Sequence, residues 1–300
     1  MKIFSGSAGR QLGSAVARGL GIGLSEVEHH VFPDGEQRIQ LRDDIVDQDV
    51  VIVQSTGMPT DQNYIELFLL LDGATRNGAK SVTAVIPYVG YSRQDHVFRT
   101  GEARSLEVMI NAIEVNGATR VIGFDFHSIK TPELFTLPVT HLSALPLFAA
   151  EIKKNGWIDN DTVLVSPDMG GLRRLSQLSE MLGGMETTSV EKNRDLTTGN
   201  IDASGVHGTI KKRCLIVDDM ISSGKTIVQA AKILIEGGAE EVSLFATHAV
   251  FSEDAPKILQ ESAVKKVFVT DTISVPESKR FEKLEVLSVA EPIVSALIQG

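Results

Sequence analysis

Cysteine, aromatic residues and net positive charge are all scarce in this sequence. Cys214 is the only cysteine, so no disulfide can form within the chain, which fits a reducing compartment and predicts a cytoplasmic protein. The longest aliphatic cluster, IELFLLL at 65–71, is interrupted by Glu66 and is far too short to cross a bilayer. The N-terminal stretch MKIFSGSAGR has too short an apolar run for a secretion signal. We therefore expect no membrane association.

The charge balance of the chain is acidic. Lysine and arginine number 29 against 39 aspartates and glutamates, which gives a formal net charge of -10. Such a surface repels the backbone of a nucleic acid, so no nucleic-acid partner is expected. Acidic proteins still bind small phosphate groups locally, through loop amides, a few basic side chains or a metal ion. The 300 residues, of which 42% are apolar, are enough for two ordinary domains.

Short apolar runs rich in valine and isoleucine alternate with segments of helical pattern. The expected buried strands are DVVIVQ (49–54), SVTAVIPYV (81–89), RVIGFDF (120–126), TVLVSPD (162–168), RCLIVDD (213–219), EVSLFATHAV (241–250) and KKVFVTDT (265–272). The expected helices include 62–76, 105–115, 171–182 and 226–236. This alternation predicts an α/β fold with mostly parallel sheets flanked by helices.

The two halves of the chain weakly repeat each other. NGAKSVTAVIPYVGYS (77–92) is similar to GGAEEVSLFATHAVFS (237–252), and each follows a strand–loop–helix unit. The repeat predicts two similar domains, 1–145 and 146–300, with the last about 15 residues as candidates to pack back onto the first domain. Gln54 and Ser55 stand where the second half has two aspartates, so only the second domain is expected to hold a working sugar-phosphate site.

The segment RCLIVDDMISSGKT places two adjacent carboxylates at the end of an expected strand, where ligands of open α/β sheets bind. Asp218 and Asp219 repel each other, so burial alone explains them poorly, whereas vicinal sugar hydroxyls suit them as hydrogen-bond donors. The loop that follows consists of Ser222, Ser223, Gly224, Lys225 and Thr226. Its amides and hydroxyls, at a helix start, suit a phosphate monoester. Together they predict ribose 5-phosphate binding; the alternative is an ordinary strand–turn–helix with a capping serine.

VDDMISSGKT is similar to the ribose-phosphate loop of type I phosphoribosyltransferases and of ribose-phosphate pyrophosphokinases. Further segments resemble the pyrophosphokinases in order along the chain: VFPDGEQRI, PYVGYSRQD, FDFHS, VSPDMGG, VEKNR and ATHAVFS. The run HVFRTGEARSLEV is more similar to archaeal-type members. The resemblance implies two domains of type I phosphoribosyltransferase-like fold. It also implies transfer of the diphosphoryl group of ATP to the anomeric hydroxyl of ribose 5-phosphate, giving 5-phosphoribosyl 1-pyrophosphate and AMP for nucleotide biosynthesis.

The resemblance implies roles for several charged residues. Lys192 and Arg194 are implied as catalytic cations at the start of a mobile polar flap, where the plain alternative is two solvated side chains. His127 and Asp168, with Asp125 as a further candidate, are implied to hold Mg²⁺ against the ATP phosphates. A lone histidine is more often a hydrogen-bonded core residue, and histidine is an uncommon ligand of Mg²⁺.

Two further segments are implied to bind ATP. The adenine segment is Phe32, Asp34, Gly35 and Glu36, and the phosphate segment is Arg93, Gln94 and Asp95. Pro-Asp-Gly is also strong turn chemistry, so the adenine segment is expected to be a turn in either case. In the family this segment often reaches a neighbouring subunit's site, which implies a homo-oligomer, a dimer or larger.

Two other functions stay open at this point. One is a phosphoribosyltransferase that consumes the activated sugar, which FPDGE, SRQD and the two-domain length oppose. The other is a non-catalytic regulatory relative, which the retained lysine, arginine, histidine and aspartates oppose. Lys225 departs from the pattern of the pyrophosphokinases, because many of them carry a small residue at this position. The contacts with the phosphate group are therefore expected to differ slightly.

Overall fold

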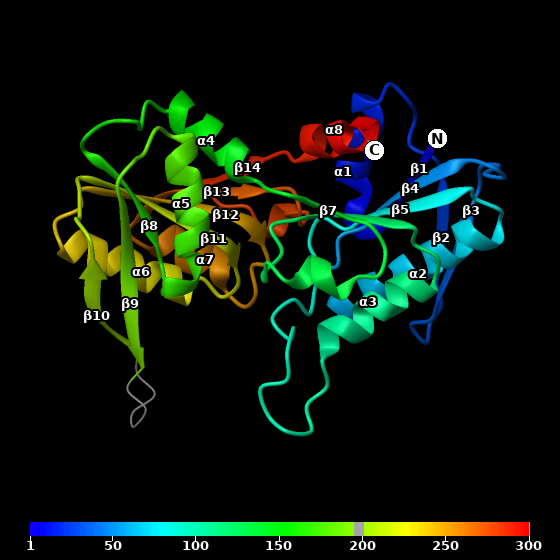
Figure 1. Cartoon of the computed structure of the whole chain (residues 1–300), viewed down its shortest axis with the longest axis horizontal. Coiled ribbons are helices and arrows are strands. Elements are labelled where there is room, and N and C mark those ends of the chain that lie inside the picture. Colours follow the sequence, from blue (N-terminus) through cyan, green and yellow to red (C-terminus); the bar gives the residue numbers. More distant parts are fainter. Residues whose placement is uncertain (195–200, 300) are drawn as a thin grey trace. The chain divides into compact units, whose positions relative to one another are not determined.

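The structure of the chain, a computed structural model, describes residues 1–194 and 201–299, with the side chains of 191–204 left undescribed. The chain divides into two compact units (Figure 1). Unit 1 comprises Met1–Leu142, Thr272–Ser274 and Ser288–Gly300, and unit 2 comprises Ser143–Asp271 and Val275–Leu287. Each unit has its own mostly parallel sheet with helices on both faces, so the expected α/β fold class is confirmed.

The sheet of unit 1 is wholly parallel, in the order β1–β4–β5–β6–β7. Its strands are β1 (Lys2–Ser5), β4 (Asp49–Val53), β5 (Ser81–Val85), β6 (Arg120–Phe124) and β7 (Val139–Leu142). In β4 every residue after Asp49 is buried, on both faces of the sheet. Helices on both sides explain why β4 reads as a continuous apolar run rather than as an alternating pattern.

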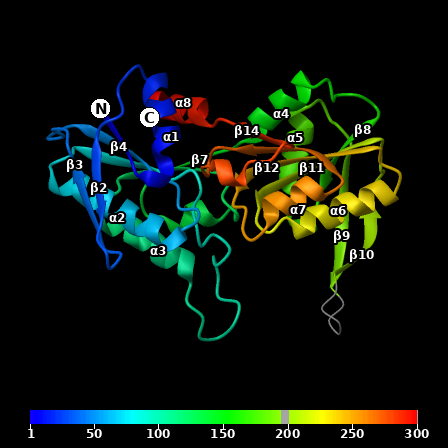
Figure 2. The same ribbon diagram turned by 180° about the vertical axis from the view of Figure 1, so that it is seen from behind.

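Two pairs of helices cover the sheet of unit 1. The pairs are α2 (Thr60–Arg76) with α3 (Ser105–Val115), and α1 (Arg10–Gly19) with α8 (Ala290–Gln299). Leu67, Leu70, Leu71 and Ala74 of α2 are fully buried, at the helical spacing that an amphipathic helix needs. Both views show α8 beside α1 (Figures 1 and 2), so the C-terminal helix completes unit 1.

The sheet of unit 2 has the order β10–β9–β8–β11–β12–β13–β14. Its strands are β8 (Thr162–Ser166), β9 (Thr187–Arg194), β10 (Ile201–His207), β11 (Arg213–Ile221), β12 (Glu241–Ala249), β13 (Val264–Thr270) and β14 (Leu284–Leu287). Helices α6 (Lys225–Glu236) and α7 (Ala255–Glu261) pack into one core, and α4 (Leu145–Lys154) and α5 (Leu172–Met181) into another. The parallel strands β8–β11–β12–β13–β14 repeat the strand order of unit 1.

Each unit carries a hairpin between its first and second parallel strands. In unit 1 it is the antiparallel pair β2 (Val27–Val31) and β3 (Gln37–Leu41), which packs on α2. In unit 2 it is β9 and β10, paired antiparallel with an irregular register between Asp202 and Gly205. The polar flap expected to start at Lys192 and Arg194 falls partly here, and residues 195–200 lie outside the described residues.

The remaining elements are short. Four 3-10 helices span Ser7–Gly9 (η1), Thr131–Leu134 (η2), Met169–Gly171 (η3) and Glu277–Lys279 (η4). Within the described part of the chain, no helix is long and apolar enough to cross a membrane.

Candidate functional site

The two adjacent carboxylates lie near the end of β11, the central strand of unit 2. The pairing of β11 with β8 stops at Ile216, whereas its pairing with β12 continues to Ile221. Asp218 and Asp219 therefore project just beyond the end of β8. The helix after β8, α5, and the helix after β11, α6, pack on opposite faces of the sheet. Such a switch point between neighbouring strands is where open α/β sheets bind their ligands.

Arg174, in the first turn of α5, contacts both carboxylates. Its Nη1 atom lies 3.6 Å from Oδ1 of Asp218 and 4.0 Å from Oδ1 of Asp219. The amide of Asp219 donates a 2.8 Å hydrogen bond to Oδ1 of Asp218. Burial and the neighbouring carboxylate of Asp219 raise the pKa of Asp218 to about 8, although Arg174 and that amide oppose the rise. Near neutral pH the two carboxyl groups therefore hold a proton for much of the time.

The loop after β11 makes the second half of the site. Gly224 precedes α6 with a φ of 75°, a left-handed conformation that a side chain would strain. No side chain caps this helix, so the capping serine of the alternative interpretation is wrong. The first-turn amides of α6 are left without a side-chain partner, which suits a phosphate group.

A neighbouring loop supports the phosphate loop. The hydroxyls of Ser222 and Ser252 lie 3.0 Å apart, and the Ser252 amide donates to the Ser222 carbonyl at 3.1 Å. Lys225 Nζ lies 2.8 Å from Oε2 of Glu253, and this bond raises the pKa of Lys225. The segment ATHAVFS, singled out in the sequence, thus leads into the wall of the loop that was predicted to bind phosphate.

Asp168 lies at the other side of the switch point, after β8. Its Oδ1 atom accepts hydrogen bonds from the amides of Gly170 (3.0 Å) and Gly171 (3.3 Å), so the carboxylate starts η3. The Ser166 hydroxyl donates to the Asp168 carbonyl at 2.7 Å. A Cβ on Gly171 would lie 2.4 Å from Ser166 Oγ, so a glycine is required there. These contacts fix the orientation of the Asp168 carboxylate.

In unit 1 the structure brings together two predicted segments. Asp125 is buried and His127 is exposed in the loop after β6. The carboxylate of Asp95 accepts hydrogen bonds from His96 and Ser128. Burial alone would raise the pKa of Asp95, but these two hydrogen bonds bring it below its ordinary value. The loop predicted to bind ATP phosphate is thus tied to the loop that carries His127.

The predicted metal residues are divided between the units. His127 belongs to unit 1 and Asp168 to unit 2. Among the residues that the structure describes, no three histidine, cysteine, aspartate or glutamate side chains gather as a metal cluster. Arg93 and Gln94 are both exposed next to Asp95.

The adenine segment forms the tip of the β2–β3 hairpin, so the expected turn is confirmed. The Phe32 amide donates to the Glu36 carbonyl (2.8 Å), and Oδ1 of Asp34 accepts from the Glu36 amide (3.1 Å). Gly35 has a φ of 92°. Phe32 is 38% exposed. Its ring packs edge-to-face against the imidazole ring of His30. The turn thus presents an accessible aromatic ring, and its adenine role stays a prediction.

Gln54 and Ser55, at the end of β4, bind the protein itself. Gln54 is fully buried; its Oε1 accepts from the Ala8 amide (3.1 Å) and its Nε2 donates to Glu66 (2.8 Å). The Ser55 hydroxyl donates to the Thr272 carbonyl at 2.7 Å. These groups are committed to internal hydrogen bonds. We infer that unit 1 does not bind a second sugar phosphate in this way.

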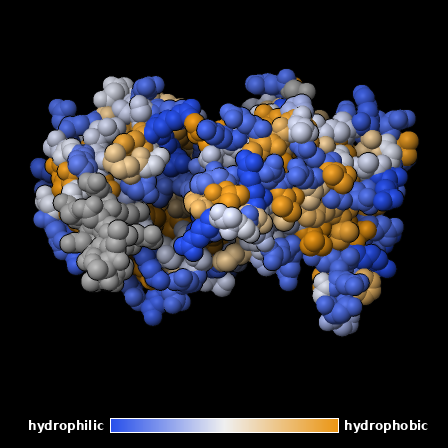
Figure 3. All heavy atoms as spheres, turned by 60° about the horizontal axis from the view of Figure 1, so that its bottom comes forward, coloured by the Kyte–Doolittle hydropathy of each residue, from blue (hydrophilic) through white to orange (hydrophobic). Residues whose placement is uncertain are grey.

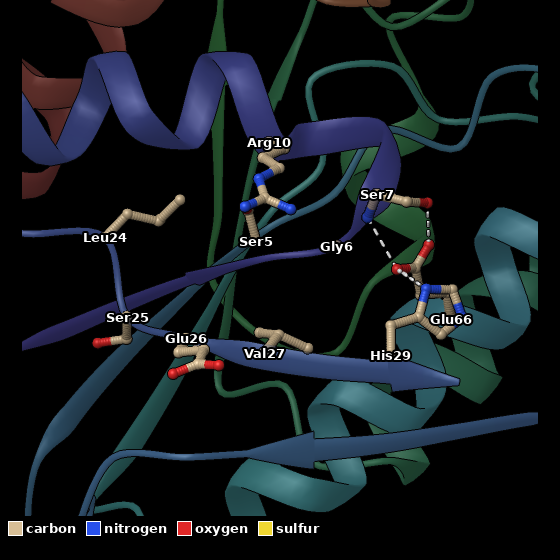
Figure 4. A pocket seen from close by; sticks show the side chains of 10 residues that line it. All are labelled: Ser5, Gly6, Ser7, Arg10, Leu24, Ser25, Glu26, Val27, His29 and Glu66. Carbon is tan, nitrogen blue, oxygen red and sulfur yellow. Dashed lines mark hydrogen bonds and ion pairs between the residues drawn. The ribbon is translucent and has the colours of Figure 1, made fainter. Parts of the chain in front are cut away.

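Glu66 also borders a cavity of about 260 Å³ in unit 1 (Figure 4). Its carboxylate points toward Ser7, whose amide donates to it at 2.8 Å, and toward His29, whose Nδ1 lies 3.4 Å away. Arg10 reaches into the cavity from the start of α1. None of the residues predicted for the site lines this cavity.

Comparisons with known proteins agree with this architecture. A family model described as the N-terminal domain of ribose phosphate pyrophosphokinase matches residues 1–117, and one described as the phosphoribosyl synthetase-associated domain matches residues 198–298. Ribose-phosphate pyrophosphokinase 1 of Streptococcus agalactiae is 36% identical over 301 residues, which cover 100% of this chain and 93% of that protein. The chain belongs to the ribose-phosphate pyrophosphokinase family.

Further members of this family are similar along most of their length. Ribose-phosphate pyrophosphokinase of Gloeobacter violaceus is 37% identical over 99% of this chain and 89% of its own. The crystal structure of phosphoribosylpyrophosphate synthetase from Mycobacterium smegmatis has a TM-score of 0.92 at 32% identity, covering 99% of this chain and 97% of that chain. These relatives are bacterial, so they give no support to the expected closeness to archaeal-type members.

Sequence reasoning missed Arg174 and Glu253. A signal for Arg174 was present, because it lies with Arg173 in the first turn of α5, where the helix dipole disfavours cations and where no acidic residue accompanies them. A cation at the positive end of a helix dipole indicates that an acidic side chain elsewhere in the fold stabilises it. Glu253 is 28 residues from Lys225, and no local sequence pattern predicts their contact.

Asp218→Asn is expected to stabilise the fold at high pH. The raised pKa means that the folded state binds the proton more tightly than the unfolded state, so this contribution to stability is present below about pH 4 and is lost as the pH rises through about 8. Asparagine does not ionise. The free energy of unfolding of the variant should exceed that of the original chain by about 1–3 kcal/mol at pH 9 and match it near pH 4.

Urea denaturation across this pH range measures the difference. Asp161→Asn, at a side chain that is 64% exposed, is the matched control and should show no such pH dependence. Equal stabilities of the Asp218 variant and the original chain at every pH would contradict the expectation.

Proposed function

We propose that this chain transfers the diphosphoryl group of ATP to the anomeric hydroxyl of ribose 5-phosphate, forming 5-phosphoribosyl 1-pyrophosphate and AMP for nucleotide biosynthesis. One observation carries the proposal: Asp218 and Asp219 stand at a sheet switch point directly before a helix start, at Gly224, that no side chain caps. Carboxylates accept hydrogen bonds from vicinal hydroxyls, and helix amides donate to a phosphate monoester. These are the two ends of ribose 5-phosphate.

The reaction requires the protein mainly to align the two substrates and to neutralise the charge of their phosphate groups. Asp218 and Asp219 orient the sugar hydroxyls and thereby the anomeric hydroxyl, while the loop 222–226 holds the 5-phosphate. Lys192 and Arg194 neutralise the negative charge that grows on the moving phosphoryl oxygens. Their backbone belongs to β9, which β8 separates from β11, and their side chains lie outside the described part of the chain.

We propose Mg²⁺ as the cofactor. Mg²⁺ in phosphoryl-transfer sites commonly takes one or two protein carboxylates and leaves its other positions to water and substrate phosphates. Asp168, an oriented carboxylate at the switch point, fits that requirement. The imidazole of His127 is a poorer donor for this ion, and the buried Asp125 beside it supplies oxygen atoms. When bound, the ion supplies positive charge to the ATP phosphates.

For the nucleotide we propose the two segments of unit 1. Phe32 offers an aromatic face for adenine, with Asp34 and Glu36 as acceptors for its amino group. Arg93 and Gln94 donate to the phosphates, and the hydrogen bonds of Asp95 hold their loop in place.

We also propose that the enzyme is a homo-oligomer, a dimer or larger, and works in the cytoplasm. The hairpin tip exposes Val31 beside Phe32. Apolar side chains also gather over α2 and α3 (Figure 3), where Ile65, Val108 and Val115 are exposed. Exposed apolar patches are typical of interaction surfaces. Closeness to archaeal-type synthetases stays a prediction.

The reaction itself is tested by incubating purified protein with ATP, Mg²⁺ and ribose 5-phosphate. AMP and 5-phosphoribosyl 1-pyrophosphate should form in equal amounts. EDTA should stop the reaction, because two highly charged substrates repel each other, and added Mg²⁺ should restore it. Absence of AMP would favour a phosphoribosyltransferase or a non-catalytic relative. Full activity in a metal-free sample would remove the Mg²⁺ proposal.

Asp218→Asn tests where the sugar binds. The variant keeps the size of the side chain but loses charged acceptor oxygens, so ribose 5-phosphate should bind more weakly by about 1–3 kcal/mol while ATP binding changes little. Calorimetric titration with each substrate measures both. A larger loss for ATP would move Asp218 to the nucleotide side.

Lys192→Ala tests the catalytic cation. A group that meets its charge only in the transition state lowers kcat and kcat/KM together, here by roughly 10²-fold or more, with little change in either KM. Lys212→Ala, at an exposed lysine of the same unit, is the matched control. A kcat equal to that of the original chain, in a variant whose circular dichroism shows it folded, would revive the non-catalytic alternative.

A further inference from the structure

Arg174 is a largely buried cation in unit 2 for which the reaction described above has no role. Its side chain is only 18% exposed, and its guanidinium lies within 4.0 Å of both Asp218 and Asp219. Burial and the positive end of the α5 dipole both disfavour a cation at this place. The carboxylate pair is therefore the interaction that stabilises it.

We propose that Arg174 is a positioning residue for ribose 5-phosphate, which favours the ionised form of the Asp218–Asp219 pair and orients both carboxylates for the sugar hydroxyls. This inference rests on the proposed binding of the sugar at the two aspartates. At 3.6 and 4.0 Å the contacts are ion pairs and exceed hydrogen-bond length. The guanidinium thus attracts both carboxylates without occupying the lone pairs that must accept from the sugar.

The electrostatics of the pair support this role. Among the described residues, the charged groups that act on Asp218 are Asp219 on β11 and Arg174 on α5. Asp219 disfavours the ionised form of Asp218, and Arg174 favours it. Removal of the guanidinium leaves two buried like charges with less compensation. A protonated carboxyl group accepts fewer hydrogen bonds, so the sugar should then bind well only at higher pH.

Arg174→Gln is the decisive variant. We expect KM for ribose 5-phosphate to rise about tenfold or more at neutral pH, while KM for ATP stays within about twofold. The acid limb of the pH profile of kcat/KM for ribose 5-phosphate should move to higher pH by about one unit. Arg174→Lys keeps the charge, so its KM for ribose 5-phosphate and its pH profile should lie between those of Arg174→Gln and the original chain. Arg173→Gln, at the exposed neighbour in the same helical turn, is the matched control and should behave as the original chain.

A change in kcat/KM without a shift of the pH profile would indicate a merely structural role and would overturn the proposal. So would an unchanged KM for ribose 5-phosphate in folded Arg174→Gln. Where Asp218→Asn raises that KM and Arg174→Gln does not, the sugar site stands and the role of Arg174 fails. Where neither variant changes it, the site of the sugar was assigned wrongly. If the glutamine variant does not fold, comparison of Arg174→Lys with Arg173→Lys tests the same contact, with smaller changes in the same direction expected for Arg174→Lys and none for Arg173→Lys.

Discussion

Repulsion between two adjacent, largely buried carboxylates is the constraint around which the site of unit 2 is arranged. Asp218 and Asp219 cannot move apart, because β11 stays paired with β12 as far as Ile221. Relief must come from a neighbouring element, and α5 provides it through Arg174. The compensation is incomplete, since the pKa of Asp218 remains raised to about 8. Such residual strain is common where binding groups must stay available to a substrate.

The same arrangement explains the loop that follows. Because β8 ends before β11 and their helices leave on opposite faces, the loop between β11 and α6 borders an open switch point. The contact of Lys225 with Glu253 spans this loop, and both side chains are more than half exposed. Exposed ion pairs contribute little to stability, so Lys225 can leave Glu253 at small free-energy cost.

The sequence predicted those parts of the fold that depend on local patterns. β4 and β5 lie within the expected runs 49–54 and 81–89, β11 begins at the expected Arg213, and α3 spans the expected 105–115. The β2–β3 hairpin was not predicted as strands, because its residues are exposed or only partly buried and include four charged or histidine side chains. The contact of Arg174 with Asp218 joins residues that are distant in sequence, so no helical or strand periodicity predicts it. Local patterns place strands and loops, whereas long-range pairs need the fold itself.

Comparison of the two units shows how one architecture serves two purposes. Where unit 2 has a repelling carboxylate pair, unit 1 has Gln54, whose amide both donates and accepts and is satisfied by Ala8 and Glu66. A neutral amide in place of two like charges removes the electrostatic repulsion. It also removes the carboxylate oxygens that could accept hydrogen bonds from sugar hydroxyls. In both units a hairpin lies between the first and second parallel strands, and it carries the predicted adenine turn in unit 1 and the predicted catalytic cations in unit 2. The units therefore differ in structure at the ends of β4 and β11 and in these hairpins, of which β9–β10 joins the sheet of unit 2 and β2–β3 forms a sheet of its own. They share the order of five parallel strands.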